Sequence, residues 1–264
     1  MIRLDFLSLT TLADYVTQRD TKGASKDGSI SFCHCSFDEA IEYARHGWPE
    51  GANKAKALLD RLTIDPPSAP HSQTYHDVSG SYVDVGEFVQ GVPECMVDFR
   101  EDKRPARFAH IVVAACYAAS FRASSAIQRG VTIAAIIDAL EAQGIRCTVD
   151  LHFTVKNESK TDQIDIHLAL KEAHAPLNLD TLTFGIAHPA YLRRLIFGAM
   201  EHLPRERHRE FSIRSGGGYG KVAPIPVVPG AIMFNMPNPS EDWSEQRTIE
   251  RIQEALAATL TGRN

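Results

Sequence analysis

The sequence has few cysteines and lacks a long apolar run. Five cysteines in 264 residues are an odd number at low density. A chain of this length does not need disulfides, so free thiols in a reducing compartment are the simplest interpretation. No apolar stretch approaches the roughly 20 residues of a membrane span. The first residues also lack the basic and then apolar segments of a signal peptide. We therefore predict a cytoplasmic protein that has no membrane partner.

Positive charge is not in excess either. Lys and Arg number 28 against 33 Asp and Glu, which gives a net charge of −5. This excludes a protein whose whole surface acts as a polycation toward nucleic acid, although a local basic patch remains open. The composition is 44% hydrophobic and 23% charged, which is ordinary for a globular chain and excludes disordered or collagen-like classes.

Common catalytic and nucleotide-binding motifs are missing. The sequence contains no Gly-x-Ser-x-Gly elbow, no His-Glu-x-x-His and no dinucleotide fingerprint. Residues 215–221 are rich in glycine, but their spacing differs from that of a phosphate-binding P-loop, and Val222 stands where a hydroxyl is needed. We predict a flexible loop here, whose Tyr219 and Lys221 contact a partner, and we expect no cofactor.

A regular pattern of strands and helices begins at residue 107. The apolar run 110–115 predicts a central strand buried on both faces, and 124–143 predicts a helix that ends at Gly144. Residues 147–156 and 164–171 alternate strictly between apolar and polar, which predicts a β-hairpin with one buried and one wet face. A helix over 190–202, a strand over 230–235 and a last helix after 240 follow.

This order of elements predicts the fold class. It indicates an α/β domain over 107–264, with a doubly wound, mostly parallel open sheet that contains one antiparallel strand. We expect residues 1–106 to form an α+β elaboration packed on that domain. Its predicted parts are a short helix or turn between Leu4 and Val16, helices over 36–46 and 53–62, and strand and turn material over 71–106.

The element order over 107–262 is similar to the von Willebrand factor A domain, in which an antiparallel edge strand follows the second core strand. That family binds a divalent cation through Asp-x-Ser-x-Ser at the end of its first strand. The matching positions here are Ala114, Cys116 and Ala118, which lack the oxygen ligands that Mg²⁺ needs. The resemblance therefore implies a degenerate metal site.

In this type of fold, the face at the carboxyl ends of the strands is the usual docking surface. The resemblance thus implies a protein-binding face. Its candidate residues are Cys116, Tyr117, Ser120, Phe121, Tyr219 and Lys221.

Several stretches resemble an uncharacterised family encoded by tailed bacteriophages. They include Phe37-Asp38-Glu39-Ala40, residues 47–52, 82–86 and 93–97, and His188-Pro189-Ala190. The resemblance implies a protein of the infected host cytoplasm, and it carries no catalytic residues.

Two clusters offer a weaker metal hypothesis. Asp77-Val78-Ser79-Gly80-Ser81 matches the A-domain cation motif, so Asp77, Ser79 and Ser81 would bind Mg²⁺ if this segment were the first core strand. The polar residues before it favour a turn instead. Cys33-His34-Cys35 is the densest ligand cluster, but its spacing is not that of zinc sites, and zinc would need Cys95, His71 or His76 as well. We favour free thiols.

Two further polar patterns have open interpretations. One is a basic stretch that suits phosphate contacts but is interspersed with glutamates, so it also fits a solvated helix end. Its residues are Arg193, Arg194, Arg205, Arg207, His208, Arg209 and Arg214. The other is on the polar face of the hairpin, where His152 and His167 are in phase with Asp150 and Asp165. They form either a His/Asp cluster or a plain exposed polar face.

These observations lead to three functional hypotheses. The first is a non-enzymatic phage protein that acts by protein–protein contact, with an AAA+ ATPase or another host factor as its partner by analogy with intracellular A domains. The second is a nucleic-acid-associated factor, in replication or transcription, that uses the basic stretch 193–214. The third is a metal-dependent enzyme.

Overall fold

A computed structural model describes residues 1–20, 23–27, 30–61, 72–101, 107–117, 121–213 and 218–238, with short pieces of 241–254. The chain divides into two compact units. Unit 1 comprises Met1–Ile64 and Phe108–Asn264, and unit 2 comprises Asp65–Arg107. This division differs from the two ranges expected above, because the residues before 65 belong with the α/β body.

Unit 1 is built on a mixed open sheet. Its described strands are β1 (Ile2–Phe6), β5 (Arg107–Ala114), β6 (Ile145–Lys156), β7 (Gln163–Lys171), β8 (Lys221–Val222) and β9 (Ile232–Phe234). Their order is β1-β7-β6-β5-β9, with β8 beside β6. β1 runs parallel to β7 and β9 runs parallel to β5, whereas β6 and β7 form the predicted antiparallel hairpin. The α/β class with a mostly parallel sheet and an antiparallel pair is confirmed.

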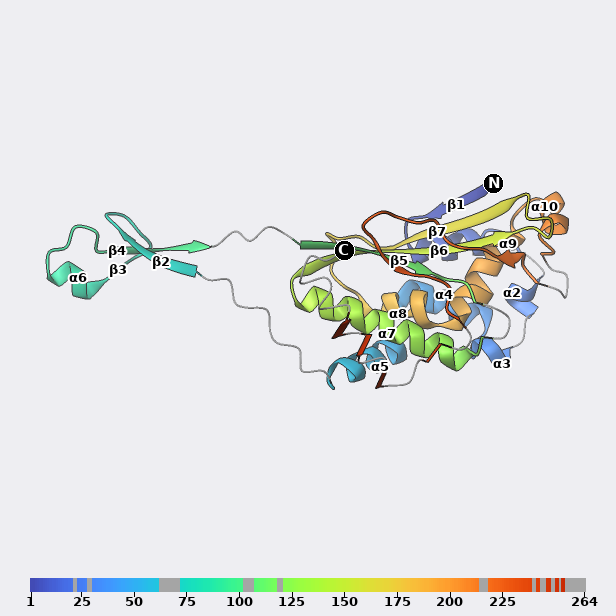
Figure 1. The fold of residues 1–264 in the computed structure, drawn as a ribbon, viewed down its shortest axis with the longest axis horizontal. Coiled ribbons are helices and arrows are strands. Elements are labelled where there is room, and N and C mark those ends of the chain that lie inside the picture. The colour runs from blue at the N-terminus through green and yellow to red at the C-terminus, as the bar shows by residue number, and fades with distance from the viewer. Residues whose placement is uncertain are drawn as a thin grey trace. The chain divides into compact units, whose positions relative to one another are not determined.

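Helices cover one face of this sheet. The described helices of unit 1 are α1 (Leu9–Thr17), α2 (Ala24–Asp27), α3 (Ile30–Cys33), α4 (Phe37–His46), α5 (Pro49–Leu59), α7 (Ala123–Ala142), α8 (Leu179–Ala187), the π-helix η1 (Tyr191–Ile196), α9 (Phe197–Glu201) and α10 (Arg205–Glu210). Figure 1 shows α4, α5, α7 and α8 on the same side of the strands. A capping box begins α4, within the predicted helix 36–46, where Ser36 Oγ accepts from the Glu39 amide and Glu39 accepts from the Ser36 amide.

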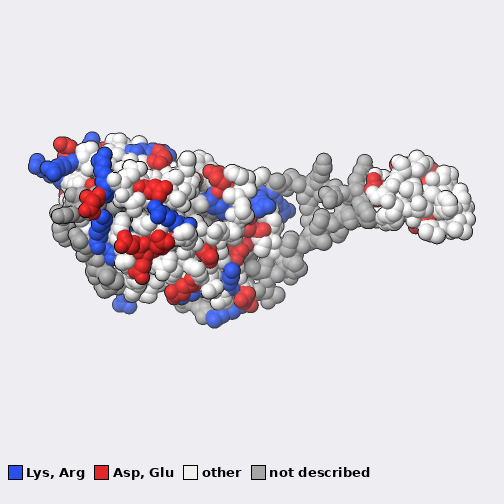
Figure 2. Space-filling view, turned by 180° about the vertical axis from the view of Figure 1, so that it is seen from behind, with Lys and Arg blue, Asp and Glu red and all other residues white. Residues whose placement is uncertain are grey.

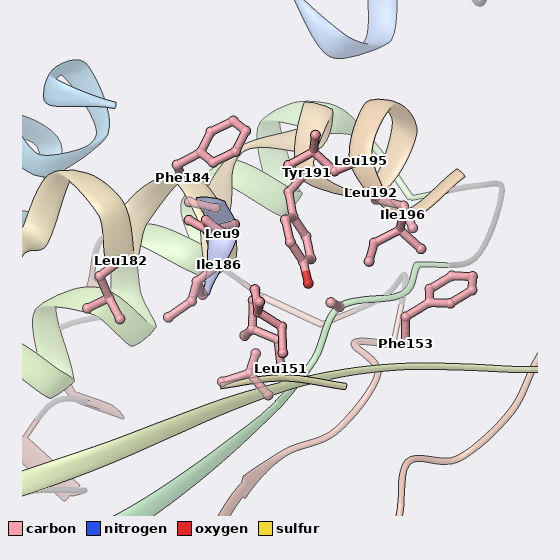
Figure 3. Close-up of a cluster of buried hydrophobic side chains, with 14 of the residues drawn as sticks. Leu9, Leu151, Phe153, Leu182, Phe184, Ile186, Tyr191, Leu192, Leu195 and Ile196 are labelled. Carbon is pink, nitrogen blue, oxygen red and sulfur yellow. The ribbon is translucent and has the colours of Figure 1, made fainter. Parts of the chain in front are cut away.

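The core lies between the sheet and these helices. Leu151 and Phe153 of β6 lie beneath Ile186 of α8 and Ile196 of η1 (Figure 3). Leu9 of α1 belongs to the same buried cluster. The segments before residue 65 and after residue 107 therefore share one core, and they fold as one body.

Two elements of unit 1 differ from the sequence-based expectation. The predicted helix or turn starting at Leu4 is wrong for its first residues, because Ile2–Phe6 is strand β1, paired with β7 from Ile164 to Leu168. β1 pairs with β7 on the side away from β6, so β7, the antiparallel partner of β6, is not an edge strand. The second is helix α8, which was not predicted from the sequence and which Asn178 caps by accepting from the Thr181 amide. The predicted last helix lies largely outside the described residues.

Unit 2 is a small antiparallel sheet with one short helix. It contains β2 (Ser72–Asp77), β3 (Tyr82–Val83), α6 (Val85–Val89) and β4 (Met96–Glu101), in the sheet order β2-β4-β3. The strand-and-turn prediction is confirmed for β2, β3 and β4, whereas helix α6 was not predicted. Asp84 caps α6, because its carboxylate accepts from the Gly86 and Glu87 amides. Val97 is the buried hydrophobic residue in the described part of unit 2.

Within the part of the chain that the structure describes, none of the helices combines the length and apolarity needed to cross a bilayer.

Candidate functional sites

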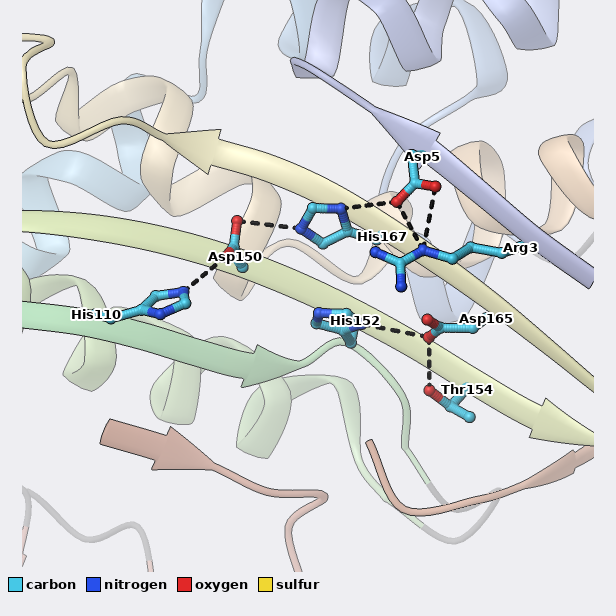
Figure 4. Close-up of polar contacts among 8 residues, drawn as sticks. All are labelled: Arg3, Asp5, His110, Asp150, His152, Thr154, Asp165 and His167. Carbon is cyan, nitrogen blue, oxygen red and sulfur yellow. Dashed lines mark hydrogen bonds and ion pairs between the residues drawn. The ribbon is translucent and has the colours of Figure 1, made fainter. Parts of the chain in front are cut away.

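A hydrogen-bonded chain of histidines and aspartates crosses the sheet face opposite the helices (Figure 4). His110 Nε2 of β5 lies 2.7 Å from Asp150 Oδ2 of β6, and the other oxygen of Asp150 lies 3.1 Å from His167 Nε2 of β7. His167 Nδ1 lies 3.1 Å from Asp5 Oδ1 of β1, and Arg3 Nε donates to Asp5 at 2.9 Å. We call these five residues the His/Asp chain. Four adjacent strands each contribute to it.

The electrostatics of the His/Asp chain favour charged partners. Hydrogen bonding to Asp150 is the largest effect on His167, and together with the Asp5 carboxylate it raises the pKa of the imidazole against the opposing effect of burial. Burial alone would raise the pKa of Asp150. Hydrogen bonds from His167 and His110 outweigh burial, so the pKa of Asp150 is lowered. Both shifts favour a protonated His167 between two carboxylates.

A second, buried group adjoins the His/Asp chain. His152 Nδ1 lies 3.3 Å from Asp165 Oδ1, which also accepts a hydrogen bond from Thr154 Oγ1 at 2.9 Å. The rings of His152 and His167 have centroids 4.8 Å apart. The structure thus brings the four in-phase residues of the hairpin together. The expectation of a wet face is wrong for His152, Thr154 and Asp165, which are all buried.

The His/Asp chain has the elements of acid–base chemistry, since a carboxylate orients an imidazole that is partly open to solvent. Metal chemistry is not favoured. In the described ranges, no group of three or more His, Cys, Asp or Glu side chains is arranged to hold a metal ion. Each donor of the chain already contacts another of its members, which is the arrangement of a cross-strand clamp.

The predicted protein-binding residues do not form one exposed surface. Cys116 and Phe121 are buried, and Tyr117 stacks on Phe121 with ring centroids 5.3 Å apart. Tyr219 is buried, where its hydroxyl donates to the Glu201 carboxylate and its ring stacks on Phe197. Of the remaining candidates, Lys221 is exposed and pairs with Glu158. Ser120 lies outside the described residues, and so does Ala118 of the degenerate metal motif.

The predicted basic stretch is dispersed by the fold. Arg194 is buried and donates to the carbonyls of Ser25 at 2.9 Å and Cys35 at 3.1 Å. Arg193 lies over the rings of Phe32 and Phe197. The other members lie on or after α10: Arg207 pairs with Asp162 and Glu210, Arg205 and Arg209 are exposed, and Arg214 lies outside the described residues.

The first predicted metal cluster lies in unit 2 rather than in the main sheet. Asp77 ends β2, and the residues after it connect to β3, as the turn interpretation predicts. Asp77 accepts from the Val78 amide, and Ser81 Oγ donates to Asp98 at 2.7 Å. The first core strand is instead β5, which ends at Ala114.

The second predicted metal cluster contains buried thiols. Burial raises the pKa of Cys33, and it raises the pKa of Cys35 to about 12. Both thiols are therefore protonated at neutral pH, whereas zinc binds thiolates. His34 is exposed and lies in the left-handed region of backbone space with φ 56°. His71, one of the three residues considered as a further zinc ligand, lies outside the described residues.

An exposed apolar surface lies on unit 2. Val85, Phe88 and Val89 of α6 are 69%, 64% and 78% exposed, and their i, i+3, i+4 spacing places them on one helix face. We call these three residues the α6 stripe. Tyr82 and Val83 of the neighbouring strand are exposed as well.

The charged residues of the segment that forms unit 2's strands and helix have one dominant sign. Residues 72–101 contain six carboxylates and one arginine. The acids are Asp77, Asp84, Glu87, Glu94, Asp98 and Glu101, and the arginine is Arg100. Figure 2 shows red atoms but no blue ones on the described part of unit 2. The surface is thus both apolar and acidic.

A cavity whose charged residues are basic rather than acidic lies in unit 1, between α5 and α7. Its volume is about 350 Å³. We call it the α5–α7 groove, and it is lined by Lys54, Ala57, Leu58, Arg61, Ile127, Gln128 and Val131. The charged residues of this lining are both basic.

The sequence of the chain can also be assigned to a protein family. The family described as Domain of unknown function (DUF7192) matches residues 1–259. The chain belongs to this family. The match includes both units of the chain. A comparison with the curated proteins and one with the solved structures gave no significant match.

Sequence reasoning missed both the α6 stripe and the α5–α7 groove. The spacing of Val85, Phe88 and Val89 after the cap Asp84 was available as a helical pattern, but such a pattern ordinarily predicts a face turned toward a core. The groove joins two helices that are far apart in the sequence, so only the fold brings its residues together.

Proposed function

We propose that this DUF7192 chain is a non-enzymatic protein-interaction factor that binds through unit 2. The observation that carries the proposal is the α6 stripe, whose side chains are 64–78% exposed on a unit that buries one hydrophobic side chain among its described residues. Contiguous exposed apolar patches of this kind mark interaction sites on soluble proteins.

The energetics support a protein partner. Full burial of a Val or Phe side chain contributes about 1.5–3 kcal/mol, so three such side chains form a core of binding energy without a large interface. The surrounding carboxylates favour a partner whose apolar surface is rimmed by Lys or Arg, and they disfavour anionic lipid and nucleic acid at this surface.

The wider setting of the function rests on the resemblances. The order β7-β6-β5-β9, with α7 between β5 and β6, supports an A-type relationship, from which β1 beyond β7 departs. Ala114 at the end of β5 supports the degenerate metal site. With the phage resemblance, this favours a phage protein of the host cytoplasm, with an AAA+ ATPase or another host factor as partner.

The second hypothesis, association with nucleic acid, retains one supporting observation, the exposure of Arg205 and Arg209 on α10. A gel shift titrated with salt tests it. Binding that weakens with salt and is lost in the double variant Arg205→Glu, Arg209→Glu would support it. Absence of binding at low salt would remove it.

A photo-crosslinking experiment tests the proposed function. A benzophenone amino acid replaces Phe88 in the full chain, and a control chain carries it at Val227, which is 83% exposed in unit 1. We expect a discrete protein adduct from position 88 and none from position 227. The adduct should weaken when Glu87 and Glu94 are changed to lysine. No adduct from position 88, or equal adducts from both positions, would overturn the proposal.

A further inference from the structure

The chain carries two surfaces of complementary chemistry. The α6 stripe on unit 2 presents Phe88 between two valines, and carboxylates such as Glu87 and Glu94 lie close to it in the sequence. The α5–α7 groove on unit 1 presents an apolar floor, including Leu58 and Val131, with basic residues at its rim. Each surface has the properties that the other requires of a partner.

We propose that the α6 stripe of one molecule docks into the α5–α7 groove of a second copy of this chain. The inference rests on the proposed function, because it names the partner of the same unit 2 surface. It commits to one occupant of the groove, a short helix with Phe88 as its central anchor.

The shapes are compatible. A helix laid in a groove is recognised through anchors at positions i, i+3 and i+4, which is the spacing of Val85, Phe88 and Val89. The groove volume of about 350 Å³ lies at the lower end of the roughly 300–1,000 Å³ of ligand pockets, so it suits a few side chains. Figure 1 shows α5 beside α7 on the helix-covered side of the sheet.

The charges are compatible as well. Lys54 and Arg61 are the charged residues that line the groove, and they would face the carboxylates beside α6. Lys54 contacts Glu50 at 2.8 Å, and Glu87 contacts His76. Exposed pairs of this kind contribute little to stability, so docking can exchange them for pairs between molecules.

The alternative of two unit 2 surfaces binding each other is electrostatically disfavoured, because residues 74–98 of each contain five carboxylates and no Lys or Arg. The proposed contact instead joins two different surfaces. Since every molecule has one stripe and one groove, two copies can exchange stripes around a two-fold axis, or a line of copies can form.

The test uses the purified full chain and two substitutions at exposed positions. Phe88→Asp puts a charge into the stripe, and Ala57→Glu puts a charge of the same sign as unit 2 into the groove. Light scattering over a concentration series should show self-association of the wild type, weakened at least tenfold in each variant and by added salt. Val227→Asp, an exposed change in unit 1, should leave it unchanged.

Mixing the two variants gives the decisive outcome. The Phe88→Asp molecule keeps an intact groove, and the Ala57→Glu molecule keeps an intact stripe. An equimolar mixture should therefore form a one-to-one complex, although each variant alone is monomeric. Charge reversal supplies a second arm: Glu87→Lys with Glu94→Lys and Lys54→Glu with Arg61→Glu should each weaken association alone and restore it when mixed. Thermal melts of every variant check that the fold is retained.

Three results would overturn the inference: a wild type that stays monomeric throughout the series, self-association that neither variant weakens, or a mixture that fails to associate. These results are distinct from failure of the proposed function. If the wild type is monomeric while the crosslinker at position 88 captures a different protein, the proposed function stands and this inference falls. If position 88 captures nothing, both fall.

Discussion

Asp150 Oδ1 lies 3.1 Å from His167 Nε2, which joins the two strands of the β6–β7 hairpin on the sheet face opposite the helices. The second oxygen of Asp150 contacts His110 on β5, and the second nitrogen of His167 contacts Asp5 on β1. One carboxylate and one imidazole thereby link the four strands. The consequence is a dependence of stability on pH.

The pKa of His167 in the folded chain lies above its ordinary value of 6.5. The stabilisation from its protonation is fully present below that value and is lost as the pH rises through the folded pKa. The pKa of Asp150 lies below 3.8, so its contribution is present above that value and is lost as the pH falls through the folded pKa. The His/Asp chain therefore contributes most at weakly acidic pH.

We expect His167→Gln to lower the free energy of unfolding by about 0.5–1 kcal/mol near pH 6. The difference from wild type should shrink as the pH rises toward about 9. Urea titrations over that range measure it. His46→Gln, at an exposed position, serves as the control. A difference between wild type and His167→Gln that is constant or grows with pH would contradict the assigned charge state.

Gly130 allows α7 to approach α8. A Cβ at this position would lie 2.2 Å from Ala187 Cα, a backbone atom that cannot move aside. Gly to Ala within a helix ordinarily stabilises by about 0.8–1.0 kcal/mol, but here we expect destabilisation of about 1–3 kcal/mol. Gly185→Ala should cost less, because its Cβ would meet the flexible end of Leu170 at 3.0 Å. Denaturant unfolding of both variants measures the order, which equal effects would contradict.

The thiols should differ in reactivity. Burial raises the pKa of Cys35 and Cys147 to about 12 and that of Cys116 to about 11, and Cys33 is also buried. Cys95 is half-buried. A thiol-reactive chromophore at mildly alkaline pH should therefore label one cysteine quickly and all five only after denaturation. Cys95→Ser should abolish the fast phase. Fast labelling of Cys33 or Cys35 would contradict this order.

Tyr219 is expected to act in folding rather than in surface contact. Its hydroxyl donates to the buried Glu201 carboxylate and accepts from the Ala24 amide at 3.1 Å. Tyr219→Phe keeps the ring against Phe197 but removes these bonds, so stability should fall by about 1–3 kcal/mol. Lys221→Ala, at an exposed position nearby, should change stability by no more than about 0.5 kcal/mol. Thermal melts compare the two variants.

The elements that the sequence predicted well are those with a local cause. The capping box at Ser36 determines where α4 begins, and strict alternation over 147–156 and 164–171 determines the hairpin. β1 was not predicted because its alternation spans only five residues and its partner strand, β7, lies far along the chain. α8 escaped because nearly all of its residues are buried, so it shows no polar face from which a helical period could be recognised.

The candidate sites show the same limit. The phase of His152, His167, Asp150 and Asp165 was readable in the sequence, and it correctly placed them on one face. Which of them are buried depends on the tertiary structure. The exposure of Phe88 could not be predicted from the sequence, because apolar residues at helical spacing have the same pattern whether they face a core or solvent.

The pairing of β1 with β7 also has a consequence for biosynthesis. During translation, Ile2–Phe6 leaves the ribosome long before its partner strand Gln163–Lys171, so the edge of the main sheet closes late. The strand pairs of unit 2 all lie within residues 72–101, and they can form while unit 1 is still incomplete. The α6 stripe is thus available to chaperones that bind nascent chains, or to a fully folded second copy, before the chain that carries it has completed its own core.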